Sequence, residues 1–218
     1  MRIDSHHSYS ERYALDHLGT ILKRNRFDGS VLITASPIPT PDFVRAIVID
    51  GLGDVPEDPR VRSVRYCVSG EIPDFTELEK RGLSLDLSGG LESVGRIAER
   101  HPALAIVIDD LGQPIRDEDE WARLIAAAAE IPQVCCKLSG LTRIAPSPRP
   151  FVQHGLRCFG PDRLMFGSDW PASLPDLTWK ANLAAFTQAI GAQPIDVRER
   201  LLGETARRFY RIPEEPAS

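Results

Sequence analysis

The chain has 218 residues, a length that fits one large domain or two small ones. Apolar residues make up 42% and charged residues 26%, as in ordinary soluble globular proteins, and no apolar run approaches the ~20 residues of a membrane span. The net charge is −5 and the 26 lysines and arginines are scattered, which argues against a nucleic-acid surface. The opening segment MRIDSHHSYS has no apolar signal core, so a cytoplasmic protein is expected.

Short apolar, β-branched runs alternate with helical patterns along almost the whole chain. Continuous apolar runs such as AIVID and LMFG are typical of strands buried on both faces. The predicted strands are Arg2–His6, Gly29–Thr34, Ala46–Leu52, Val61–Val68, Leu83–Ser88, Ala105–Asp110, Val134–Ser139 and Leu164–Asp169. The predicted helices are Tyr13–Arg24, Glu92–Arg100, Asp117–Ala129, Pro150–Phe159, Trp179–Ile190 and Asp196–Tyr210. This alternation predicts an α/β fold, a single (β/α)8 TIM-type barrel, as one domain over residues 1–218.

Two links between predicted strands are too short and too rich in proline for ordinary helices. SPIPTPDFVR joins the second strand to the third, and GDVPEDPR joins the third to the fourth. Stretches of this kind form turns with at most one helical turn, so we expect the helices after strands 2 and 3 to be shortened or missing. That loss would expose the outer faces of these strands, which predicts a homodimer or another partner covering them.

Polar residues gather where the predicted strands end. The active site of a (β/α)8 barrel lies at the C-terminal ends of its strands. The candidates at these ends are His6, His7, Arg65, Tyr66, Asp86, Asp109, Asp110, Lys137, Asp169 and Trp170. Carboxylates and imidazoles that converge on one mouth suit acid–base chemistry or metal binding.

Several candidates have a purely structural alternative. Asp4 can cap the turn after the first strand, and Arg65 can serve a structural ion pair. Asp109 and Asp110 are neighbours in a predicted strand, so only one of them is expected to face the barrel interior. Asp169 follows an apolar strand and precedes Trp170-Pro171. Because it lies in no predicted helix, a place on the polar face of a helix cannot account for it. It is therefore the strongest candidate for a site role.

Six segments, taken in chain order, resemble a known family. They are IDSHHS, VRSVRY, IVIDDLGQP, CCKLSGL, FGPDRLMFGSDWP and ETARRFYRI. They are similar to segments of the second amidohydrolase family, TIM-barrel hydrolases that include sugar-acid and dicarboxylic lactonases and related decarboxylases. The resemblance covers nearly the whole chain, and FGPDRLMFGSDWP is its most specific part. It implies a hydrolase in which Asp169 is the catalytic aspartate.

The chain departs from the family pattern at its metal ligands. The family has Asp-x-His-x-His on the first strand; His6 matches the first histidine, but Ser8 stands at the second. Asp110 stands where the sixth-strand segment has histidine, and the fifth-strand histidine has no clear counterpart. A catalytic zinc takes about three protein ligands, which His6, Asp110 and Asp169 would supply. Because zinc prefers the imidazoles that are missing, no bound cofactor is expected, with zinc on these three residues as the alternative.

The resulting prediction is a hydrolase of a lactone or a similar cyclic carboxylated small molecule. Asp169 would act as general base, and His6 would orient the nucleophile or polarise the carbonyl. One positioned carboxylate contributes ~10²–10⁴-fold, enough for an activated ester but too little for an unactivated amide. The residues predicted to contact the substrate are His7, Arg65, Tyr66, Asp110, Lys137 and Trp170.

Two other functions stay open. Loss of family histidines and of two covering helices also fits a catalytically decayed barrel that serves as a binding or interaction protein. A lyase or cyclase could use the same carboxylate without hydrolysis. The sequence determines neither which substrate is used nor the direction of the reaction.

Overall fold

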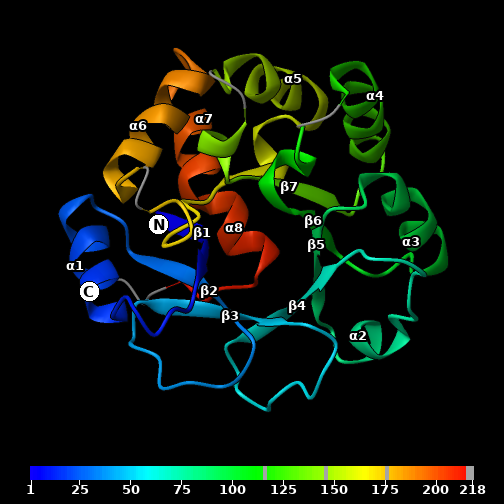
Figure 1. The fold of residues 1–218 in the computed structure, drawn as a ribbon, viewed down its shortest axis with the longest axis horizontal. Helices are drawn as coiled ribbons and strands as arrows, with labels where there is room; N and C mark the ends of the chain where they lie inside the picture. The colour runs from blue at the N-terminus through cyan, green and yellow to red at the C-terminus, as the bar shows by residue number, and fades with distance from the viewer. Residues whose placement is uncertain (115–116, 145–146, 175–176, 215–218) are drawn as a thin grey trace.

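The computed structural model describes residues 1–114, 117–144, 147–174 and 177–214. Eight parallel strands follow one another in chain order around a ring, as Figure 1 shows. They are β1 (Ile3–Ser8), β2 (Gly29–Thr34), β3 (Val44–Asp50), β4 (Val61–Cys67), β5 (Ser84–Ser88), β6 (Ile106–Ile108), β7 (Val134–Leu138) and β8 (Leu164–Phe166). The expected TIM-type barrel is confirmed.

The ring closes between β1 and the residues that follow β8. The amide of Asp169 donates to the carbonyl of His6 at 2.9 Å, and the amide of Ser8 donates to the carbonyl of Trp170 at 2.8 Å. His7 and Trp170 form an isolated parallel bridge beside these bonds. The closure is therefore made by the same two segments that carry His6 and Asp169.

Helices surround most of the ring (Figure 1). They are α1 (Leu15–Arg24), α2 (Thr76–Lys80), α3 (Val94–Arg100), α4 (Glu118–Ala129), α5 (Arg149–Phe159), α6 (Trp179–Ile190), α7 (Ile195–Glu199) and α8 (Thr205–Phe209). Side chains cap two of them: Asp117 accepts the amide of Glu120 at the start of α4, and Thr178 accepts that of Ala181 at the start of α6. Among the described residues, no helix is long and apolar enough to cross a membrane.

The side of the barrel around β3 carries loops instead of helices (Figure 1). This agrees with the two proline-rich links, since neither residues 35–43 nor residues 51–60 form a helix. The strand faces beneath are nevertheless covered: Leu32, Ile47 and Ile49 are buried, and Phe43 and Val55 from the loops pack on the same core. The expected homodimer stays a prediction, but exposed strand faces no longer support it.

Candidate functional site

A cluster of buried ions fills the barrel beneath its mouth. The Nζ of Lys137 lies 2.5 Å from Asp86 Oδ2 and 2.9 Å from Asp109 Oδ1. Asp86 also accepts the hydroxyl groups of Ser63, at 2.5 Å, and of Tyr210, at 2.8 Å. Burial disfavours the charge on Lys137, but the two carboxylates outweigh it and raise the pKa of this ammonium above its ordinary value. Lys137 is therefore a charged residue sealed inside the barrel.

Above this cluster, His6, Asp110 and Asp169 converge from the ends of β1, β6 and β8. Each offers one ligand atom, and these atoms all lie within 4.8 Å of one another. The Nε2 of His6 is 3.8 Å from Asp169 Oδ1, and its Nδ1 is 3.6 Å from Asp109 Oδ1. All three side chains are buried. The structure thus brings together the three residues that the sequence suggested as a ligand set.

Asp109 and Asp110 both reach this region, so the expectation that only one of them could do so is wrong. Strand β6 ends at Ile108, and Asp109–Gly112 form a tight turn. Asp110 has a φ of 51°, in the left-handed region, and receives the Ser139 hydroxyl on its Oδ1 at 2.7 Å. Side chains alternate between faces only while the backbone is extended, and here it no longer is.

The three residues differ in how their surroundings affect their charge. Burial lowers the pKa of His6 well below its ordinary value, and the nearby Lys137 charge adds to this. Burial raises the pKa of Asp169 to about 7; the Asp110 carboxylate adds to the rise, and the Arg143 guanidinium opposes it. A neutral imidazole can bind a metal, and a carboxyl group with a pKa near 7 can move protons at neutral pH.

Asp4 lies at the closure of the barrel and has a structural role. Its Oδ1 accepts the amide of Ser168 at 2.8 Å, and its Oδ2 accepts the indole N–H of Trp179 at 2.7 Å. The sequence suggested that Asp4 caps the turn after the first strand. The structure instead shows it holding the end of β8 and helix α6.

Arg65 lies at the rim of the mouth. Its Nε is 2.9 Å from Asp109 Oδ2, and its Nη1 is 3.6 Å from Asp50 Oδ2. The side chain is 17% exposed, so it takes part in ion pairs while keeping limited access to solvent. Tyr66 is partly exposed, packs edge-on against the ring of Phe75 and donates its hydroxyl to the carbonyl of Glu71 at 3.2 Å.

The remaining predicted substrate contacts are His7, Lys137 and Trp170, and their contact with a substrate stays a prediction. All three side chains are buried. The Nε2 of His7 is 2.9 Å from the hydroxyl of Ser30, and Trp170 packs against the ring of Tyr13. The ammonium of Lys137 is paired with Asp86 and Asp109.

The residue that sequence reasoning missed is Arg143, in the short turn Leu141–Arg143 after β7. Its Nη2 lies 2.8 Å from Asp110 Oδ2 and 3.1 Å from Asp169 Oδ2. Its side chain is 53% exposed, so it approaches the two carboxylates from the solvent side. The available signal was a basic residue in the loop after the seventh strand, three positions beyond Gly140.

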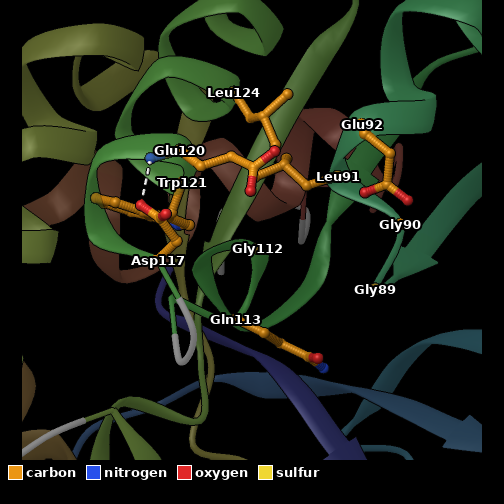
Figure 2. Close-up of a pocket in the computed structure, with 10 residues that line it drawn as sticks. All are labelled: Gly89, Gly90, Leu91, Glu92, Gly112, Gln113, Asp117, Glu120, Trp121 and Leu124. Carbon is orange, nitrogen blue, oxygen red and sulfur yellow. Dashed lines mark hydrogen bonds between the residues drawn. The ribbon is translucent and has the colours of Figure 1, made fainter.

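Two hollows adjoin the mouth. The smaller, of about 270 Å³, is lined by Asp110, Gln113, Gly140, Arg143 and Ile144. The larger, of about 440 Å³, lies between the loops after β5 and β6 and helix α4, and Gln113 also lines it (Figure 2). Its charged lining residues are Glu92, Asp117 and Glu120. Of the three convergent residues, Asp110 lines the smaller hollow, together with Arg143.

Comparison with known proteins finds a family and several relatives. The family model described as amidohydrolase matches residues 44–212. An L-fucono-1,5-lactonase from Burkholderia multivorans is 36% identical over 145 residues, which cover 57% of this chain and 49% of that protein. Uncharacterized protein y4mH from Sinorhizobium fredii is 30% identical over 149 residues, which cover 63% of this chain and 50% of that protein. The chain spans about half the length of the curated relatives it matches.

Solved structures share the fold. An amidohydrolase from Burkholderia multivorans with bound zinc superposes with a TM-score of 0.83 at 24% identity, over 98% of this chain and 100% of that one. A putative 2-pyrone-4,6-dicarboxylic acid hydrolase from Pseudomonas putida superposes with a TM-score of 0.74 at 22% identity, over 98% of each chain. At these identities the likeness concerns the fold.

Proposed function

We propose that this chain, which belongs to the amidohydrolase family, hydrolyses a lactone or a similar small cyclic ester at the mouth of its barrel. The observation that carries the proposal is the convergence of His6, Asp110 and Asp169, of which Asp110 lines an open hollow. The names of two relatives support the substrate class, one an L-fucono-1,5-lactonase and the other a putative hydrolase of a cyclic dicarboxylic acid.

The reaction needs one proton acceptor that later gives the proton back. Asp169, as the carboxylate, takes a proton from the water that attacks the ester carbonyl carbon. His6, neutral and with its Nε2 3.8 Å from Asp169 Oδ1, orients that water. The ring C–O bond then breaks, and Asp169 returns the proton to the departing oxygen. One water is consumed and one hydroxy acid is formed. Arg65 supplies positive charge at the rim for a substrate carboxylate.

The residues at the mouth also fit a divalent metal ion. His6, Asp110 and Asp169 provide three protein ligands, the usual number in catalytic zinc sites. The Oδ2 of Asp169 is buried and accepts no hydrogen bond from the described residues, although Arg143 lies near it. A metal held there would act as a Lewis acid on the ester carbonyl. The low metal content expected from the missing imidazoles stays a prediction.

A panel of lactones tests the proposal. Purified protein is mixed with five- and six-membered sugar lactones and cyclic dicarboxylic esters, and acid release is followed in weak buffer. Turnover of at least one class is expected. In the variant Asp169→Asn, the catalytic rate constant should fall by about 10²-fold or more with little change in melting temperature, because the amide keeps the shape but cannot accept the proton.

The panel also separates the alternatives. Full activity in Asp169→Asn would remove Asp169 from the mechanism. A ligand bound at the mouth without turnover would favour a decayed barrel that binds small molecules. A product formed without uptake of oxygen from ¹⁸O-labelled water would favour a lyase or cyclase.

A further inference from the structure

Arg143 places one guanidinium nitrogen between two of the three convergent side chains. Its Nη2 is 2.8 Å from Asp110 Oδ2 and 3.1 Å from Asp169 Oδ2. The other oxygen of Asp110, Oδ1, already accepts the hydroxyl of Ser139 at 2.7 Å. The arginine therefore occupies the oxygen of Asp110 that Ser139 leaves free.

A divalent ion held by His6, Asp110 and Asp169 would contact the same two carboxylate groups. The ligand atoms of His6, Asp110 and Asp169 lie within 4.8 Å of one another, and Arg143 reaches into the pair of carboxylates among them. The buried Oδ2 of Asp169 accepts no hydrogen bond from the described residues, and the Nη2 of Arg143 lies 3.1 Å from it. A guanidinium and a metal ion on these carboxylates would repel each other and compete for the same negative charge.

The local structure lets Arg143 approach and leave. Gly140, with a φ of +59°, makes room: a Cβ there would lie 2.7 Å from Arg143 Nη2 and 3.0 Å from Asp110 Cγ. The side chain of Arg143 is 53% exposed and borders the hollow of about 270 Å³. Arg65 differs from Arg143 in its exposure and in its partners. Its side chain is only 17% exposed, and its ion pairs are with Asp109 and Asp50.

We propose that Arg143 is the resident cation of this site and that a divalent metal ion binds to His6, Asp110 and Asp169 only by displacing its guanidinium. The inference concerns the site of the proposed function, but it predicts the binding of metal alone. Its failure and the absence of lactone turnover are therefore separate results.

Calorimetric titration with Zn²⁺ alone tests the competition. Metal-free wild-type protein is compared with Arg143→Gln and with the matched control Arg65→Gln, which removes an equal charge near the mouth without freeing Asp110 or Asp169. Arg143→Gln should bind zinc at least about tenfold more tightly than the wild type, and Arg65→Gln should differ from the wild type by less than about threefold. The added affinity should disappear in Arg143→Gln/Asp110→Asn, which lacks the contested carboxylate.

Three calorimetric results would overturn the proposal. Equal affinities of wild type and Arg143→Gln would show that arginine and metal do not share the site. Equal gains in both arginine variants would show only a long-range effect of charge. A folded Arg143→Gln that binds no zinc would show that the three side chains do not hold a cation.

A second measurement uses the wild-type protein and does not depend on the folding of Arg143→Gln. The guanidinium NMR signal of Arg143 is assigned by its loss in Arg143→Lys and followed during zinc addition. Zinc should shift this signal towards that of a solvent-exposed arginine and leave the Arg65 signal in place. An unchanged Arg143 signal in the zinc-saturated protein would contradict displacement.

Discussion

Lys137 holds a positive charge inside the barrel only because Asp86 and Asp109 contact it on two sides. In Lys137→Met the volume is kept, but Asp86 loses its ammonium partner and Asp109 keeps only Arg65 as a counter-charge. Removing one partner of a buried ion cluster typically costs ~3–5 kcal/mol, so the free energy of unfolding should fall by about that amount in urea denaturation. Lys80→Met is the matched control, since its exposed pair with Glu77 is loose, at 3.9 Å, and its loss should change little. Similar losses in both variants would contradict the role of the buried cluster.

At the level of single residues, strand ends could be predicted from the sequence but side-chain directions could not. His6, Asp110 and Asp169 were expected together and do lie together. The ion pairs of Lys137 could not be predicted, because they are made with Asp86 on β5 and with Asp109 in the turn after β6. Arg143 was missed because it lies in a turn beyond the strand end, where no periodic pattern marks it. The catalytic roles of these residues stay predictions.

At the level of elements, Asp4 joins three of them: β1, the end of β8 and α6. Asp4→Ala leaves the buried amide of Ser168 and the indole N–H of Trp179 without their acceptor. Each unsatisfied buried donor costs ~1–3 kcal/mol, so thermal unfolding should show a loss of at least about 2 kcal/mol. The variant Asp54→Ala, at an exposed position in the loop after β3, should leave stability unchanged. A stable Asp4→Ala would show that Asp4 does not hold the closure.

Helix α1 carries a glycine whose replacement tests how the loops cover the helix-poor side. Alanine normally stabilises a helix interior relative to glycine by ~1 kcal/mol. At Gly19, however, a Cβ would lie 2.7 Å from the ring of Phe43, which belongs to the loop after β2. Gly19→Ala should therefore destabilise the protein in chemical denaturation, whereas Gly95→Ala in α3, with open space around it, should be neutral or stabilising. If Gly19→Ala stabilised the protein, the loop that carries Phe43 would have to move away from the new methyl group at little energetic cost.

The bounds of two elements could be predicted to the residue, whereas one short helix was not expected. The bounds Gly29–Thr34 of β2 and Trp179–Ile190 of α6 match the expectation from pattern alone. Helix α2 was not expected, because five residues carry too little periodicity and its buried Leu78 depends on tertiary packing. The predicted helix Asp196–Tyr210 is interrupted at Arg200–Glu204, where the chain packs on β1 and β8.

At the level of the whole molecule, the C-terminal segment reaches back into the barrel. Tyr210 is buried and donates its hydroxyl to Asp86, 124 positions earlier in the chain. Tyr210→Phe removes this bond and should lower the free energy of unfolding by about 1–2 kcal/mol, measured by urea denaturation. The exposed Tyr9 supplies the control Tyr9→Phe, for which no loss is expected. Equal stability of both variants would show that the hydroxyl is not needed inside the barrel.

The closure between β1 and β8 also determines when the site can exist during synthesis. Asp4 and Ser168, which meet at this closure, are 164 positions apart in the chain. Contacts between such distant positions form only after a large entropic cost of loop closure has been met, and they cannot form before the later strand has left the ribosome. A nascent chain can pair β1 with β2 early, but His6 then faces no carboxylate from Asp169. Catalytic competence would therefore arise in one late step, and unfinished chains would be chemically inert.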